Sequence, residues 1–94
     1  MENKVKNWIK SGTASIVDVR TPAEFAGGHV KGSKNIPLQE LVNRMDEIKA
    51  MQPVVLCCAS GGRSGQAAHY LTSQGVECEN GGSWLSVNAI TNNK

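Results

Sequence analysis

The amino-acid sequence predicts an α/β domain with a mainly parallel central sheet flanked by helices. Two short apolar runs, 15–19 and 53–57, have the pattern of strands that are buried on both faces. Helix-start signals follow each run, and strands that alternate with helices are typical of a parallel sheet. The ligand site of such a sheet lies where its strands end, so we expect it directly after residue 57.

The first strand and the first helix are predicted from local signals. The run 15–19 is rich in β-branched residues, which favour strands. Thr21 is an N-cap residue, Pro22 suits the first helical position, and Glu24 can close a capping box. The glycine pair 27–28 is expected to end this short helix.

The middle of the chain predicts a longer helix and the second strand. The segment 38–51 has the spacing of one amphipathic helix, and 53–57 is the continuous apolar run. The side chains of the helix that are expected to face the core are Leu38, Leu41, Val42, Met45 and Ile48.

The second half of the sequence predicts that the alternation of strands and helices continues. A tight loop is expected over 58–62, and a helix over 64–74 with Gly75 as its stop and Ala67, Ala68 and Leu71 toward the core. Further elements are expected in the order strand 76–79, turn 80–82, helix within 83–90 and frayed tail 91–94.

Length and composition indicate a single domain over residues 1–94. The chain has ten lysines and arginines against eight acids, and the formal net charge is +2. The basic residues are scattered, so we expect neither nucleic acid nor a membrane as a partner. Residues 1–10 contain four charged side chains and no continuous apolar run, which predicts neither a signal peptide nor a membrane span.

The three cysteines favour a reducing compartment, because two of them are adjacent and form a poor disulfide framework. We expect a cytoplasmic monomer. Cys57 lies in an apolar run and Cys78 on a short strand, and both are expected in the core. No C-x-x-C spacing is present, so we expect no metal site that uses His29 or His69.

The segment after the second strand combines features that activate a cysteine. Cys58 stands at the end of the strand, and a helix opens a few residues later. The glycines between them allow successive N–H groups to converge on an anion, and the helix N-terminus adds positive potential. Such surroundings lower a cysteine pKa from about 8.5 to roughly 3.5–7.5. Cys58 is therefore the predicted nucleophile, and its predicted binding loop is Ala59, Ser60, Gly61, Gly62, Arg63 and Ser64.

This loop resembles the active-site loop of single-domain rhodaneses. That loop usually reads Cys, any residue, a small residue, Gly, any residue, Arg, Ser, and residues 58–64 fit it. A separate resemblance to the N-terminal signature of the family lies upstream, in 16–20, 24–25, 28–30, Gly32 and 35–37. Residues 75–76 and 80–84 extend the similarity weakly.

The resemblance implies a single rhodanese-like domain that acts as a sulfurtransferase. Cys58 would take a sulfane sulfur from a small donor such as thiosulfate or polysulfide and hold it as a covalent persulfide, with no further cofactor. The acceptor would be cyanide or a thiol, including a thioredoxin-like or other sulfur-accepting protein. The loop amides would cradle the outer sulfur, and Arg63 would hold the thiolate or an anionic donor. Arg20, Glu24 and His29 are expected to fix the loop after the first strand through an ion pair and hydrogen bonds.

Two other functions stay open on the sequence. Counted from Cys57, the loop is one residue longer and fits rhodanese-fold phosphatases and arsenate reductases, whose wider loop holds a phosphate or arsenate group. Gly61, at the third position after Cys58, favours the shorter loop. The other alternative is a non-catalytic persulfide carrier or redox-sensing module that uses Cys58 as a reactive thiol.

Overall fold

The computed structural model describes residues 2–93 and contains one parallel sheet. The sheet order is β2-β1-β3-β4, so β3 is an inner strand, and all five of its residues are buried. The predicted α/β class with a mainly parallel sheet is confirmed. The strands are β1 (Ser15–Asp18), β2 (Lys34–Asn35), β3 (Val54–Cys58) and β4 (Cys78–Ser83).

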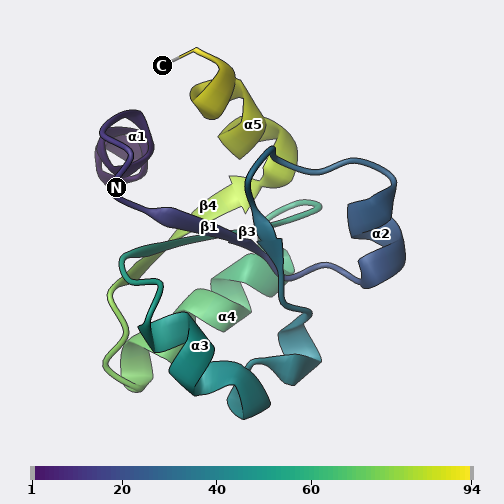
Figure 1. Cartoon of the computed structure of the whole chain (residues 1–94), viewed down its shortest axis with the longest axis vertical. Coiled ribbons are helices and arrows are strands. Elements are labelled where there is room, and N and C mark those ends of the chain that lie inside the picture. The colour runs from purple at the N-terminus through teal and green to yellow at the C-terminus, as the bar shows by residue number, and fades with distance from the viewer. Residues whose placement is uncertain (1, 94) are drawn as a thin grey trace.

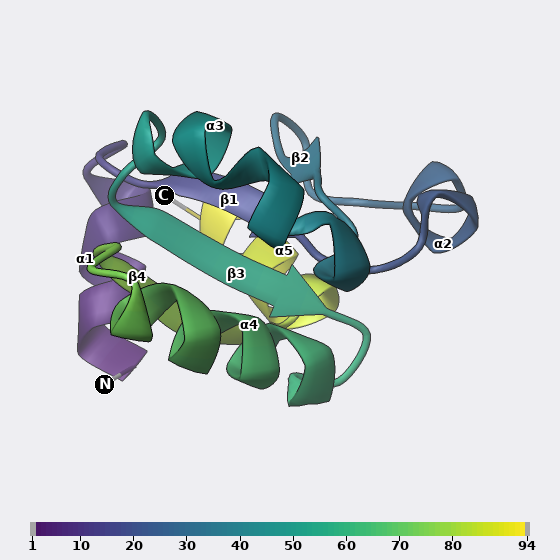
Figure 2. The same ribbon diagram turned by 90° about the horizontal axis from the view of Figure 1, so that it is seen from below.

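Helices cover both faces of the sheet (Figure 1). One face is covered by α1 (Glu2–Lys10) and α5 (Trp84–Asn92), and the other by α3 (Met45–Lys49) and α4 (Gly62–Ser73). Figure 2 shows that α2 (Pro22–Ala26) stands apart from both layers, on the side toward which β3 points. None of the helices within residues 2–93 combines the length and apolar character that a membrane crossing requires.

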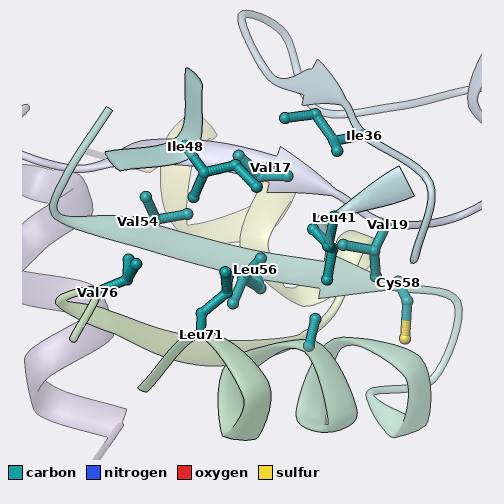
Figure 3. Close-up of a cluster of buried hydrophobic side chains, with 11 residues drawn as sticks. Val17, Val19, Ile36, Leu41, Ile48, Val54, Leu56, Cys58, Leu71 and Val76 are labelled. Atoms are coloured by element: carbon teal, nitrogen blue, oxygen red, sulfur yellow. The ribbon is translucent and has the colours of Figure 1, made fainter. Parts of the chain in front are cut away.

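Each face of the sheet has its own apolar cluster. Leu56 and Cys58 of β3 contribute to the cluster beneath α3 and α4 (Figure 3), whereas Val55 and Cys57 contribute to the cluster beneath α1 and α5. This alternation arises because successive side chains of a strand point to opposite faces. The two adjacent cysteines therefore lie in different layers of the molecule.

The local signals for β1, α2, β3 and α4 are confirmed. The hydroxyl of Thr21 accepts the N–H of Glu24, and the Glu24 carboxylate accepts the N–H of Thr21, which completes the predicted capping box. Ala67 and Leu71 of α4 are buried as expected. The helix α4 begins at Gly62, two residues earlier than predicted.

The predicted single helix over 38–51 is wrong. The segment consists of two 3₁₀ turns, Leu38–Glu40 and Val42–Arg44, followed by the short α3. A 3₁₀ turn has three residues per turn, so Leu38 and Leu41 share one side and Val42 is rotated outward. Val42 is 64% exposed, whereas Leu41 is buried.

The last strand is present as predicted, but its predicted bounds and the turn after it are wrong. In place of a strand over 76–79 and a turn at 80–82, β4 runs from Cys78 to Ser83 and includes both glycines. Its pairing with β3 shifts register between Leu56 and Cys57, which is a β-bulge. Glycine in a strand is typical of a bulge or a close backbone approach, and this interpretation fits here.

The two ends of the described chain are more ordered than expected. Residues 91 and 92, predicted to fray, belong to α5, and residue 94 lies outside the described part. The helix α1 was not predicted, although Val5 and Ile9 have helical spacing and both are buried. α1 and α5 contact each other across the face of the sheet, which stabilises both.

Candidate active site

The candidate nucleophile lies where β3 ends and α4 begins. Cys58 is the last residue of β3, and Gly61 precedes the first turn of α4 with a φ of +104°, a conformation that favours glycine. The chain thus turns sharply between the sulfur and the N-terminus of the helix. Figure 3 shows the sulfur of Cys58 at the end of β3, on the side of α4.

Three donors surround the sulfur of Cys58. The backbone N–H of Gly61 lies 3.0 Å from Sγ, the N–H of Ser64 lies 3.4 Å away, and the Ser64 hydroxyl lies 3.3 Å away. Burial acts to raise the pKa of this thiol, but hydrogen bonds from Ser64, Gly61 and Ser60 outweigh it and lower the pKa to about 7. A substantial fraction of Cys58 is therefore thiolate near neutral pH.

Cys57 has the opposite environment. Its side chain is fully buried in the cluster beneath α1 and α5. Burial, followed by the charge of Asp18, raises the pKa of Cys57 to about 12. Cys57 therefore stays protonated at neutral pH, and its sulfur lies on the face of the sheet away from the loop.

Asn80 of β4 links the strand to the loop, and sequence analysis did not identify this role. Its Oδ1 accepts the Ser64 hydroxyl at 2.7 Å and the N–H of Gly82 at 2.9 Å, and its Nδ2 donates to the carbonyl of Gly61 at 3.2 Å. Because Ser64 has one hydroxyl proton, Asn80 and the sulfur of Cys58 compete for it. In the sequence, an asparagine beside a glycine pair predicts only a turn.

The guanidinium of Arg63 is bound to Glu24, and among residues 2–93 it makes no hydrogen bond to the sulfur of Cys58. Its two terminal nitrogens bind the two carboxylate oxygens of Glu24, with Nη1–Oε1 at 2.7 Å and Nη2–Oε2 at 3.0 Å. The hydrogen bond from Arg63, with further help from Thr21, lowers the pKa of Glu24 to about 2. Glu24, expected only to fix the loop after β1, also contacts the cysteine loop.

The loop after β1 is fixed by a buried ion pair, as expected for Arg20. Its partner is Asp18, at 2.7 Å between Nη2 and Oδ2, which sequence analysis did not name. Arg20 also donates to the carbonyl of Gly28 and lies over the ring of Trp84. His29 is exposed and hydrogen-bonded through Nδ1 to the carbonyl of Phe25.

Of the remaining predicted loop residues, Ser60 also contributes a backbone hydrogen bond that lowers the pKa of Cys58. Ala59, Ser60 and Gly62 are exposed and place no bulky side chain over Cys58. Within residues 2–93, no group of three or more His, Cys, Asp or Glu side chains is arranged to hold a metal ion. The N–H and O–H groups around Sγ form a cradle of the kind that stabilises a thiolate.

Comparison with known proteins places this arrangement in a family. The family described as "Rhodanese-like domain" matches residues 1–85. The chain is 48% identical over 62 residues to the uncharacterized protein YqhL of Bacillus subtilis, and 45% identical over 60 residues to a sulfurtransferase of Allochromatium vinosum. These matches cover 66% and 64% of this chain but 49% and 56% of those proteins, so the chain spans about half the length of the curated relatives it matches.

Solved structures agree with the family match. A rhodanese-like domain protein from Staphylococcus aureus has a TM-score of 0.77 at 27% identity, with 93% of this chain and 86% of that protein covered. The human single-domain sulfurtransferase TSTD1 has a TM-score of 0.70 at 27% identity, with coverage of 83% and 82%. From the match over residues 1–85, the parallel sheet and the cysteine loop at its carboxyl edge, we conclude that the chain belongs to the rhodanese-like domain family.

Proposed function

We propose that this chain is a sulfurtransferase that carries a sulfane sulfur as a persulfide on Cys58. The observation that carries the proposal is the set of three donors within 3.4 Å of Sγ, which is the geometry that stabilises a sulfur anion. The names of the Allochromatium and human relatives support the same reaction class.

The reaction has two displacements at sulfur. In the first, the Cys58 thiolate attacks the outer sulfur of the donor and forms a new S–S bond. The bond between that sulfur and the rest of the donor breaks, and its electron pair leaves with the rest of the donor, which is sulfite when the donor is thiosulfate. In the second, cyanide or an acceptor thiolate attacks the outer sulfur of the persulfide, and Cys58 leaves as a thiolate. The same N–H groups stabilise the anion at the start, between the steps and at the end.

The acceptor is proposed to be a small thiol, cyanide or a thioredoxin-like protein. The exposed backbone around Ala59, Ser60 and Gly62 supports this, because an acceptor must approach the outer sulfur directly. The phosphatase alternative finds no support, since it needs Cys57 as the nucleophile and that thiol is buried on the opposite face with a pKa of about 12.

Two serine variants test the proposal. Wild type, Cys58→Ser and Cys57→Ser are each treated with thiosulfate or polysulfide, and intact mass and thiocyanate formation after addition of cyanide are recorded. We expect a sulfur adduct and turnover in wild type and Cys57→Ser, and neither in Cys58→Ser. Cys57→Ser is the matched control because it removes a thiol from the neighbouring position.

Other outcomes would replace the proposal. If Cys57→Ser alone loses the adduct, the longer loop is the working one, and hydrolysis of aryl phosphates becomes the next assay. If Cys58 takes up sulfur but no acceptor discharges it, the chain is a persulfide carrier or sensor and not an enzyme.

A further inference from the structure

Arg63 and Glu24 form a two-pronged ion pair beside the cysteine loop. The residues are 39 positions apart, and α2 brings the carboxylate to the first turn of α4. The side chains are 37% and 36% exposed, so both face the solvent from which a small donor arrives. In this arrangement the carboxylate accepts one hydrogen bond from each terminal nitrogen of the guanidinium and places a negative charge beside it.

The carboxylate is held in place independently of Arg63. Its Oε1 also accepts the N–H of Thr21 at 3.0 Å and the hydroxyl of Thr21 at 3.2 Å, which are bonds of the capping box. A glutamate fixed by its own helix start is already oriented to receive Arg63, so the pair forms at little further cost in the side-chain entropy of Glu24.

Arg63 is close enough to the reacting sulfur for its charge to matter. It lies between Gly62 and Ser64, and the N–H of Ser64 donates to Sγ. The pKa of Arg63 is raised mainly by its hydrogen bond with Glu24, and the negative charge of Cys58 adds to this effect. The buried guanidinium of Arg20 is in turn bound to Asp18. The hydrogen-bond donors to Sγ are the neutral groups of Gly61 and Ser64, while the guanidinium groups of Arg63 and Arg20 are each paired with a carboxylate.

We infer that Glu24 selects the sulfur donor: by occupying Arg63, it disfavours a dianion such as thiosulfate and favours a donor of lower charge, namely an alkyl persulfide. This inference rests on the proposed sulfurtransferase function. Attack on thiosulfate expels sulfite, which retains both negative charges and needs a cation as it leaves. Attack on the outer sulfur of an alkyl persulfide, RS–SH, expels a thiol or thiolate with one negative charge at most, which N–H donors can accommodate.

The test compares two donors across four proteins. Wild type, Glu24→Gln, Glu47→Gln and the double variant Glu24→Gln/Arg63→Gln are assayed with thiosulfate and with the persulfide of an uncharged alkyl thiol, with cyanide as acceptor. Glutamine can still close the capping box, so α2 is retained while the charge is removed. Glu47 is the matched control because it also forms an ion pair with an arginine, Arg44, but lies in α3, outside the cysteine loop. The hydrogen bond from Arg44 is the largest cause that lowers the pKa of Glu47 to about 2.

We expect wild type to have the higher kcat/KM with the alkyl persulfide. Glu24→Gln should raise kcat/KM for thiosulfate roughly tenfold and change that for the alkyl persulfide much less, because release of Arg63 benefits the dianion most. Glu47→Gln should match wild type, and the double variant should lose the gain.

Several results would overturn the inference. If the wild-type protein has the higher kcat/KM with thiosulfate, the inference is wrong. This result needs no variant, so the test stays decisive even if Glu24→Gln fails to fold. An unchanged donor ratio in folded Glu24→Gln contradicts it as well, and a gain that persists in the double variant excludes the route through Arg63. If wild-type Cys58 takes sulfur from neither donor, the proposed function itself fails, which is a different outcome from a wrong preference between two working donors.

Discussion

Two adjacent cysteines of this chain have opposite chemistry because a strand alternates its faces. Cys57 and Cys58 are both buried, so burial by itself does not separate them. The difference is that Cys58 lies where β3 ends and the N–H groups of the next loop converge, whereas Cys57 packs in the apolar cluster beneath α1 and α5, where the charge of Asp18 adds to the effect of burial. At Cys58, hydrogen bonds to the thiolate outweigh the effect of burial and lower the pKa. At Cys57 no such hydrogen bond acts from the described part of the chain, and burial raises the pKa.

The pH dependence of alkylation tests this account at Cys58. Its pKa of about 7 predicts that the rate of reaction with iodoacetamide is low below pH 7, rises through that pH and levels off above it, since only the thiolate reacts. Ser64→Ala removes the hydroxyl that donates to Sγ and destabilises the thiolate. We expect its midpoint to move upward by roughly one pH unit.

Ser60→Ala is the matched control for this variant. Its backbone N–H remains and contributes as before, so the midpoint should stay near that of wild type. A midpoint that is equal in Ser64→Ala and wild type would mean that the Ser64 hydroxyl gives its proton to Asn80, which lies nearer, and not to the sulfur.

At the scale of elements, the bulge in β4 connects the sheet to the loop. Gly82 has a φ of +85°, and the register shift next to it lets Asn80 face Ser64 and Gly61. Gly81 allows the strand to approach its neighbours closely. A Cβ at this position would lie 2.7 Å from methyl groups of both Val55 and Val87.

Gly81→Ala is therefore expected to destabilise the fold. The added methyl group forces β3 or α5 to move, and overpacking of this kind costs about 1–3 kcal/mol. The free energy of unfolding in urea measures the loss. Gly27→Ala is the control, because its Cβ would meet only backbone oxygens at 3.5 and 3.8 Å, and we expect a change within about 0.5 kcal/mol. A Gly81→Ala variant as stable as wild type would mean that β4 can shift to make room.

Elements with strong local signals could be predicted from sequence, and elements decided by their neighbours could not. β1 and β3 are continuous apolar runs, and α2 has all the residues of a capping box. The glycines of β4 are typical of a turn when only the local sequence is considered. In the structure Gly81 is required by close contact with Val55 and Val87, and Gly82 by its positive φ. The 3₁₀ turns over 38–44 share most of the apolar positions of a regular helix, so spacing alone could not distinguish the two.

The same distinction applies to the site. The groups that donate to Sγ belong to Gly61 and Ser64, three and six residues after Cys58, so this part of the site could be predicted from one short segment of sequence. Glu24 and Asn80 reach this loop from 39 and 16 residues away, through α2 and β4. Their contacts depend on how helices and strands are placed in space, which no spacing rule for a single segment can express.

At the scale of the whole molecule, two apolar layers share one sheet. Ile9 of α1 lies in the layer that buries Cys57, and Ile48 of α3 lies in the layer on the opposite face; both are almost fully buried. β3 contributes to both layers, so loss of one layer exposes one whole face of the central strand. A domain of this size is expected to unfold in a single cooperative step.

Labelling of Cys57 tests whether the two layers open together. Its thiol is fully buried, so under native conditions it should react only through opening of the fold. Ile9→Val and Ile48→Val remove the same methyl group from opposite layers, and each costs about 0.5–1.5 kcal/mol. We expect both variants to accelerate Cys57 labelling by the same factor, roughly two- to tenfold. The labelling rate is measured by peptide mass analysis at fixed pH. Val42→Ala is the control, because Val42 is exposed and its truncation should leave the rate unchanged. If Ile9→Val accelerates labelling and Ile48→Val does not, the α1–α5 layer opens by itself, and the shared strand does not couple the two faces.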